Sequence, residues 1–266
     1  MSGVASKFDD LKVRVLSAIV MVGVAGVTIW MGGPLFLVAL AAAAGLMIWE
    51  LASMLAPDRS RLPLLLGAFA AAAVLGGPLL PFNLGLPLLF VPAMIAVGQL
   101  DGNRRIFAIY SVMICIAALG LYSLRVDYGL IWMVWLALVV IASDVMGYFA
   151  GRLIGGPKFW PKVSPKKTWS GTVAGWVGAV IVALFFVKYT DSTGELIGIS
   201  IAIAMAAQLG DISESAVKRK AGVKDSSHLI PGHGGLLDRF DGMLGASIIL
   251  LLIEQIVDFP PLPGLS

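Results

Sequence analysis

Residues 128–152 read YGLIWMVWLALVVIASDVMGYFAGR, and this stretch decides the class of fold. Its apolar run is as long as a helix that crosses a bilayer, which needs about 20 residues. One carboxylate, Asp144, lies inside the run, and Arg152 follows it eight residues later. With a rise of about 1.5 Å per residue, Asp144 would lie about 12 Å deeper in the membrane than Arg152. An ionisable group at that depth is costly, so Asp144 is a functional candidate unless it only pairs with a basic residue of a neighbouring helix.

The rest of the chain has the same apolar character. Of its 266 residues, 59% are hydrophobic and 13% are charged, whereas an average soluble chain carries about 25% charged residues. This composition excludes a water-soluble fold, because so much apolar surface could not be buried. The sequence therefore predicts an all-α polytopic integral membrane protein. The net charge of +3 is explained by basic loops beside a membrane, and we expect no nucleic acid partner.

About nine apolar runs are candidate membrane spans. They cover residues 13–31, 35–54, 62–80, 84–97, 106–124, 128–150, 172–187, 196–209 and 243–257. We divide the chain into an N-terminal membrane region, residues 1–126, with the first five spans, and a catalytic membrane region, residues 127–266, with the last four. The polar residues favour this division, since the first five spans contain almost none of them.

The charges in the connecting segments predict the orientation. Lys and Arg are retained on the cytoplasmic side of a membrane protein. With nine spans, 17 of the 19 Lys and Arg residues fall on one side, and only Arg125 and Lys188 fall on the other. We therefore predict a cytoplasmic N-terminus and an external C-terminus. The expected location is the inner (plasma) membrane, with the active site facing the cytoplasm.

Four carboxylates are predicted to converge at the cytoplasmic face. Asp144 and Asp211 lie near the cytoplasmic ends of the sixth and eighth spans, and Asp238 and Asp241 lie just before the ninth. Asp238 and Asp241 are three residues apart, which places both on one face of a helix. Clustered carboxylates repel one another unless a cation lies among them, and Mg²⁺ typically takes one or two carboxylates together with substrate phosphates. We expect these four residues to bind Mg²⁺, and a second ion stays open.

Basic residues, hydroxyl groups and glycines accompany these carboxylates. Residues 164–168 read SPKKT, and Ser215 and Lys218 follow Asp211 at the spacing of one helix face. Residues 231–235 read PGHGG, and glycines let a backbone approach a phosphate, whose charge successive N–H groups can bind. The plainer alternatives are membrane anchors or contacts to anionic lipids for the basic residues, and a tight turn for the glycines.

Residues 215–241 read SAVKRKAGVKDSSHLIPGHGGLLDRFD. This segment resembles the signature of the phosphatidate cytidylyltransferases, also called CDP-diacylglycerol synthases, and we find no mismatch across its 27 residues. The dipeptide before it, Gly210 with Asp211, the segment 164–169 and the many spans are also similar to that family. One departure is Ser170, where many relatives have an acidic or amide residue, so Ser170 is not assigned as a ligand.

The resemblance implies that CTP and phosphatidic acid give CDP-diacylglycerol and pyrophosphate in phospholipid biosynthesis, with Mg²⁺ required. It also implies that Asp211 and Asp238 are metal ligands. We expect catalytic roles for Asp211, Asp238, Asp241, Lys218, Arg219, Lys224 and Arg239. We expect substrate contacts from Ser164, Lys166, Lys167, Thr168, Ser215, His233, Gly234 and Gly235. The partners would be CTP and membrane phosphatidic acid, and a homodimer stays open.

The chemistry of the substrates agrees with this reaction. A phosphate monoester has a second pKa near 6, so phosphatidate is largely dianionic at neutral pH and can attack the α-phosphorus of CTP without a general base. Catalysis then depends on positioning and charge neutralisation. Two alternatives stay open. One is a CTP-dependent lipid or polyprenol kinase, and the other is a transporter with a cytoplasmic basic gate, although a carrier usually binds its substrate near the midplane.

Overall fold

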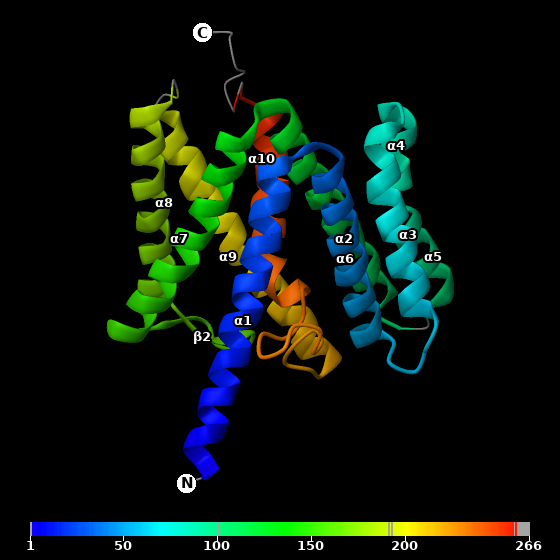
Figure 1. Ribbon diagram of the computed structural model, residues 1–266, viewed down its shortest axis with the longest axis horizontal. Coiled ribbons are helices and arrows are strands. Elements are labelled where there is room, and N and C mark those ends of the chain that lie inside the picture. The colour runs from blue at the N-terminus through cyan, green and yellow to red at the C-terminus, as the bar shows by residue number, and fades with distance from the viewer. Residues whose placement is uncertain (1, 101, 191, 193, 258, 260–266) are drawn as a thin grey trace. The chain divides into compact units, whose positions relative to one another are not determined.

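The computed structural model describes the backbone of residues 2–100, 102–190, 192, 194–257 and 259, and the side chains from residue 12 onwards. In this part of the chain nearly all regular structure is helical (Figure 1). The chain divides into two compact units. Unit 1 contains Met1–Cys115 and Ala221–Arg239, and unit 2 contains Ile116–Lys220 and Phe240–Ser266. Helix α10 (Leu237–Glu254) therefore begins in unit 1 and continues in unit 2.

Unit 1 contains the N-terminal helices. They are α1 (Ser2–Met31), α2 (Gly33–Leu55), α3 (Leu62–Gly76), the 3-10 helix η1 (Gly77–Leu79), α4 (Phe82–Leu88), α5 (Val91–Gln99) and the first part of α6 (Arg104–Ser123). Helices α2 and α3 pack along their length (Figure 1). A Cβ atom on Gly45 would lie 2.9 Å from the carbonyl oxygen of Gly67. Glycine is therefore required at this crossing, in line with the close backbone packing of helices in lipid.

Two predicted spans of unit 1 differ from a single buried helix. The apolar window of α1, within Lys12–Met31, has no buried residue in the structure, as expected of a helix whose side chains face lipid. The predicted span at residues 84–97 is instead two short helices, α4 and α5. Pro87 lies inside α4 and Pro92 lies in the first turn of α5. Proline lacks the N–H group that a continuous helix needs, which explains the break.

Unit 2 contains the helices that follow. After the end of α6 come the π-helix η2 (Leu124–Tyr128), α7 (Leu130–Leu153), strands β1 (Lys158–Trp160) and β2 (Ser164–Thr168), α8 (Trp169–Tyr189), α9 (Glu195–Ala221) and most of α10. Strands β1 and β2 form an antiparallel hairpin, which the sequence did not predict. The hairpin brings the chain from α7 into α8, and these two helices pack along their length with Gly147 against Gly171.

The core of unit 2 joins α7, α9 and α10. The indole Nε1 of Trp135 on α7 donates to Ser200 Oγ on α9 at 3.1 Å. Gly210 of α9 lies against the backbone of Asp241 and Gly245 on α10, where a Cβ atom would have no room. This close crossing of α9 and α10 sets the distance between the carboxylates that the two helices carry.

The predicted class, an all-α polytopic membrane protein, is confirmed. Eight helical segments of the described chain are long and apolar enough to cross a membrane. They match the first eight predicted spans, although α3 with η1, α4 with α5, and α6 with η2 each make one segment. The ninth predicted span corresponds to α10, a helix of 18 residues that is not among the eight. The number of spans and the orientation of the termini stay predictions.

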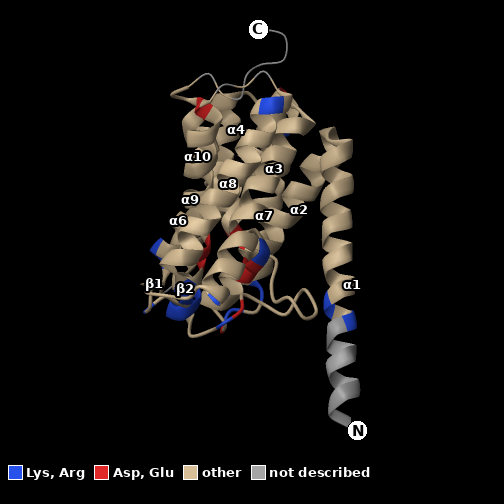
Figure 2. Cartoon of the chain, turned by 90° about the vertical axis from the view of Figure 1, so that its left-hand side faces the viewer, with Lys and Arg blue, Asp and Glu red and all other residues tan. Residues whose placement is uncertain are grey.

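The apolar helices carry few charged positions along their length. Figure 2 shows Lys, Arg, Asp and Glu close to β1 and β2, while the helices labelled in that view are mostly tan. The two structural units are divided differently from the two predicted regions, since residues 221–239 join the N-terminal helices. This division does not test where catalysis takes place, so the catalytic role of residues 127–266 stays a prediction.

Candidate active site

A buried carboxylate of α2 holds the loop between α9 and α10, residues 222–236, which we call the signature loop. Glu50 is 0% exposed. Its Oε1 accepts hydrogen bonds from Ser227 Oγ at 2.6 Å and Leu236 N at 2.8 Å. Its Oε2 accepts from Ser226 Oγ at 3.2 Å and Leu237 N at 2.7 Å. Four donors thus compensate for the buried charge, and Glu50 fixes the loop and the start of α10.

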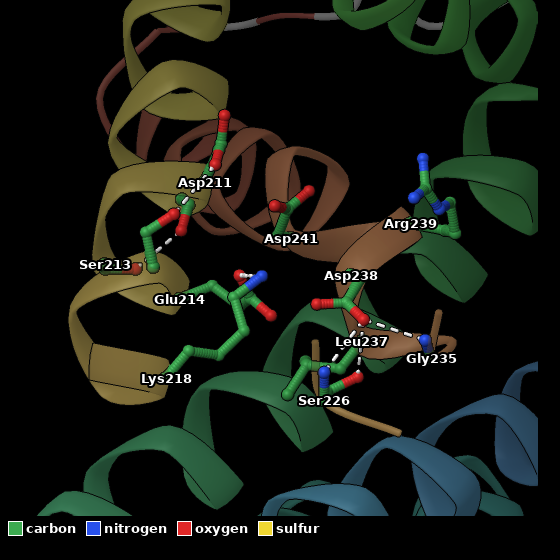
Figure 3. A network of polar contacts seen from close by, with 12 residues as sticks. Asp211, Ser213, Glu214, Lys218, Ser226, Gly235, Leu237, Asp238, Arg239 and Asp241 are labelled. Atoms are coloured by element: carbon green, nitrogen blue, oxygen red, sulfur yellow. Dashed lines mark hydrogen bonds and ion pairs between the residues drawn. The ribbon is translucent and has the colours of Figure 1, made fainter. Parts of the chain in front are cut away.

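Asp238, on α10, also binds the signature loop through hydrogen bonds. One oxygen, Oδ2, accepts from Ser226 N at 2.9 Å and Gly235 N at 2.8 Å (Figure 3). Ser226 Oγ lies 3.0 Å from the same oxygen and shares its one hydrogen between Asp238 and Glu50. Gly235 has no room for a side chain, because a Cβ atom would meet Ser226 Oγ and Glu50. Gly234 has a φ of 83°, which favours glycine. The turn interpretation of these glycines is therefore confirmed, whereas contact of Gly234 and Gly235 with a phosphate stays a prediction.

In unit 2 a predicted lysine and a predicted carboxylate meet. Lys167 Nζ, on β2, lies 2.5 Å from Asp211 Oδ2, on α9, with the two side chains 23% and 34% exposed. The same ammonium donates to the carbonyl oxygen of Gln208 at 3.3 Å. Ser215 Oγ, one turn further along α9, donates to Asp211 Oδ1 at 3.4 Å. Three predicted site residues thus form one partly exposed cluster.

Gln208 supports this cluster and was not predicted. Its Nε2 donates to Ser143 Oγ at 3.3 Å and to the carbonyl oxygen of Thr172 at 3.1 Å. Its Oε1 accepts from the indole Nε1 of Trp176 at 3.1 Å. One polar side chain therefore joins α7, α8 and α9 next to Asp144 and one turn before Asp211. The sequence contained one signal for it, because Gln208 is a polar residue inside the predicted span 196–209.

Three of the four predicted metal ligands belong to unit 2. The charges of Asp144, Asp211 and Asp241, on α7, α9 and α10, interact electrostatically. Asp241 Oδ1 also accepts from Gly242 N at 2.7 Å. The described residues contain no group of three or more His, Cys, Asp or Glu side chains placed to hold one ion. Because Mg²⁺ usually takes only one or two carboxylates and completes its shell with phosphates and water, this donor set fits Mg²⁺.

Asp238, the fourth predicted ligand, lies on α10 three residues before Asp241, so the helix places both on one face as predicted. Asp238 belongs to unit 1 and Asp211 to unit 2, and their convergence stays a prediction.

Lys218, a predicted catalytic residue, has a structural partner. Its Nζ lies 2.5 Å from Glu214 Oε2, and the two side chains are 12% and 0% exposed. Figure 3 shows both on the same side of α9. A buried carboxylate needs a counter-charge, so Lys218 neutralises Glu214 whatever else it binds. Glu214 was missed, although its spacing of four residues from Lys218 is typical of a helical ion pair.

Among the predicted residues of the hairpin, Thr168 has a clear structural role. It is 3% exposed, and its Oγ1 accepts from Gly171 N at 3.2 Å as the N-cap of α8. Ser164 begins β2 opposite Trp160, and Lys166 is exposed on the same strand. Their contact with substrate stays a prediction.

The remaining basic residues lie at the surface. Arg219, on α9, and Lys224, in the signature loop, are exposed. Arg239 is also exposed, and its Nε and Nη2 donate to the carbonyl oxygen of His233 at 2.9 and 2.7 Å. The side chains of Lys224, His233 and Arg239 line a pocket of about 350 Å³. Unit 1 therefore carries a pocket with basic residues from the signature loop and the start of α10.

Comparison with known proteins agrees with the resemblance seen in the sequence. The sequence model of the cytidylyltransferase family matches residues 12–257. A phosphatidate cytidylyltransferase of Brucella suis biovar 1 (strain 1330) is 34% identical over 269 residues, which cover 96% of this chain and 97% of that protein. A phosphatidate cytidylyltransferase of Haemophilus influenzae is 39% identical over 143 residues, which cover 48% of this chain and 49% of that protein. One of Mycobacterium bovis is 38% identical over 158 residues, which cover 58% and 50%. The chain belongs to the cytidylyltransferase family.

Proposed function

We propose that this protein transfers the cytidylyl group of CTP to phosphatidic acid and so makes CDP-diacylglycerol and pyrophosphate for phospholipid biosynthesis. The observation that carries the proposal is the 34% identity, over 96% of the chain, to a phosphatidate cytidylyltransferase. The eight apolar helices support it, because a lipid substrate reaches an enzyme most directly within the membrane. The partly exposed cluster of Lys167, Asp211 and Ser215 supplies polar groups for a nucleotide.

The reaction makes one bond and breaks one bond at the α-phosphorus of CTP. A phosphate oxygen of phosphatidate forms the new P–O bond, and the bond from the α-phosphorus to the bridging oxygen of the β-phosphate breaks. Pyrophosphate leaves with that electron pair. The monoester is largely dianionic at neutral pH, so the chain need not supply a base. Its residues must instead bring two anions together and stabilise the charge on the leaving group.

Lys167 is suited to bind the pyrophosphate that leaves. Its ammonium is held by Asp211 Oδ2 at 2.5 Å and by the Gln208 carbonyl oxygen at 3.3 Å, yet the side chain is 23% exposed. A lysine fixed in this way offers its remaining N–H to a phosphate oxygen with little loss of rotamer entropy. Lys218 is less suited, since its side chain is only 12% exposed and its partner Glu214 is fully buried.

The carboxylates of unit 2 would hold Mg²⁺. Asp211 and Asp241 are the proposed ligands, with Asp144 close enough for its charge to interact with both. When bound, Mg²⁺ would neutralise the phosphates and orient the attacking and leaving oxygens. Asp238 as a further ligand, a second ion and a homodimer stay open. The asymmetric distribution of Lys and Arg supports a site that faces the cytoplasm from the inner membrane.

The test is a product assay with the purified, full-length protein in detergent. Phosphatidic acid, Mg²⁺ and CTP labelled in the cytidine ring are incubated, and the lipid fraction is analysed. The proposal expects the cytidine label in CDP-diacylglycerol. A lipid kinase would leave the label in CDP, and a transporter would leave it in CTP, so either result would refute the proposal.

A further inference from the structure

The pocket of unit 1 is formed by the signature loop and by the first helix. Its volume is about 350 Å³, at the lower end of the range for ligand sites. Arg14 enters it from α1, and Lys224, Asp225, His228, His233 and Arg239 enter it from the loop and the start of α10. Arg14 was not among the residues predicted from the sequence. Arg14 therefore adds to the pocket a basic side chain that lies outside the signature, residues 215–241.

Two contacts attach α1 to the loop. Ser17 Oγ donates to the carbonyl oxygen of Pro231 at 3.0 Å. A Cβ atom on Gly232 would lie 2.6 Å from Arg14 Cγ, so the glycine packs directly on the stem of the arginine. Arg14 and Ser17 are three residues apart and lie on one face of α1. This face of α1 thus fits the loop and points Arg14 into the pocket.

The charge of the pocket favours an anion. Three Lys or Arg side chains, Arg14, Lys224 and Arg239, face one carboxylate, Asp225. His233 adds a second feature. Its backbone N–H donates to the carbonyl oxygen of Ile230, and its own carbonyl oxygen accepts from Arg239. The buried ring atom Nδ1 has no hydrogen-bond partner among the described residues. A buried polar atom without a partner is costly, and a bound ligand that pairs with Nδ1 would remove this cost.

We propose that this pocket binds the phosphate monoester of phosphatidate and that Arg14 is one of its binding residues. The inference rests on the proposed function, because it names the site of the lipid substrate. The planar guanidinium of arginine can bind two phosphate oxygens at once. Arg14, Lys224 and Arg239 hold the dianion, and His233 pairs with it through Nδ1.

The position of α1 favours the lipid phosphate over the phosphates of CTP. Arg14 lies two residues after the start of the candidate span Lys12–Met31, and the end of a span is where lipid headgroups lie. The neighbouring apolar side chains of α1 are open, with Leu16 64% and Ile19 63% exposed. A phosphatidate whose headgroup binds Arg14 can therefore keep its acyl chains in the bilayer beside α1.

The first test compares Arg14→Gln with Lys12→Gln in the full-length protein. Both changes remove one positive charge from α1, but Lys12 is turned about 200° away from Arg14 around the helix and does not line the pocket. Arg14→Gln should raise the KM for phosphatidate about tenfold, the size expected for one charge-assisted hydrogen bond. The KM for CTP should not change, and Lys12→Gln should resemble the unmodified protein in both.

Arg14→Lys is the second variant. It keeps the charge and the methylene stem against Gly232, but loses the second hydrogen bond. The KM for phosphatidate of Arg14→Lys should lie between the KM of the unmodified protein and that of Arg14→Gln. If Arg14→Gln does not fold, as judged by its thermal melting in detergent, Arg14→Lys still tests the pocket.

The second test measures binding without turnover. Radiolabelled phosphatidate in detergent micelles is added to the protein without CTP or Mg²⁺, and unlabelled phosphatidate, CTP or inorganic phosphate competes. Retention should fall with Arg14→Gln, and CTP should compete no better than inorganic phosphate. If CTP displaces the lipid and the CTP KM rises in Arg14→Gln, the pocket binds the triphosphate and the inference is wrong. Equal phosphatidate binding and KM in Arg14→Gln, Arg14→Lys and Lys12→Gln would also overturn it. Failure of the unmodified protein to make CDP-diacylglycerol would instead refute the proposed function.

Discussion

The carboxylates of the two units have the same chemistry but different surroundings. In unit 1, both oxygens of Glu50 and one oxygen of Asp238 accept hydrogen bonds from the signature loop. In unit 2, Asp211 pairs with Lys167, and its charge repels that of Asp241. A carboxylate surrounded by backbone N–H groups stabilises a loop, whereas carboxylates that repel one another favour a bound cation. The comparison shows that Glu50 and Asp238 hold the loop, whereas metal binding by Asp211 and Asp241 stays a proposal.

The largest effect is expected for Asp211→Asn. The substitution keeps the volume of the side chain but removes a negative charge from the proposed Mg²⁺ site. Turnover should fall about 100-fold or more, equal to about 2.7 kcal/mol of transition-state stabilisation. The melting temperature in metal-free buffer should change little, because the relieved repulsion with Asp241 offsets the lost ion pair with Lys167. Asp58→Asn, at an exposed position between α2 and α3, is the matched control, and steady-state kinetics are the measurement. Normal turnover in Asp211→Asn would remove this carboxylate from the site.

Glu50→Gln should act on stability instead. The amide nitrogen of glutamine cannot accept a hydrogen bond, so donors that now reach one carboxylate oxygen would lose their acceptor. We expect the free energy of unfolding to fall by about 2 kcal/mol and the signature loop to become sensitive to limited proteolysis. Added Mg²⁺ should not restore the loop. Glu195→Gln, at the exposed start of α9, should leave both measurements unchanged. A loop that stays protected in Glu50→Gln would contradict the anchoring role.

Lys167→Gln should have an intermediate effect. It removes one charge-assisted contact to a phosphate while the proposed metal ligands remain. The KM for CTP should rise about tenfold, with a smaller change in turnover. Lys162→Gln is the control, since Lys162 is exposed in the turn between β1 and β2. If both variants keep the same KM for CTP, Lys167 only balances the charge of Asp211.

The smallest effect is expected for Ser215→Ala. The distance from Ser215 Oγ to Asp211 Oδ1 is 3.4 Å, and a hydrogen bond of this length is weak. Turnover should fall less than about threefold, well below the effect of losing a full charge-assisted bond. A fall as large as that of Asp211→Asn would mean that Ser215 contacts the substrate directly.

The helices were predictable because the signal for a span is local: its length and its apolar composition. The pairing of Lys167 with Asp211 joins residues that the SPKKT segment and the Gly210–Asp211 dipeptide had already marked. Glu50 was missed because its partners lie 176 to 187 residues away. Glu50 is, like Asp144, an ionisable group inside an apolar run, and it is one of the few polar residues of the first five spans. The β1–β2 hairpin was missed because its strands are short and show no alternation of apolar residues.

Direct measurement of metal binding tests the division between the two groups of carboxylates most simply. Mn²⁺, which accepts the same oxygen ligands as Mg²⁺, is titrated into the full-length protein in detergent without nucleotide or lipid and followed by electron paramagnetic resonance. We expect Asp211→Asn to weaken Mn²⁺ binding about tenfold or more, whereas Glu50→Gln, under conditions where it stays folded, should bind Mn²⁺ within about twofold of the unmodified protein. Equal binding by Asp211→Asn and the unmodified protein, with a loss in Glu50→Gln, would contradict metal binding by Asp211.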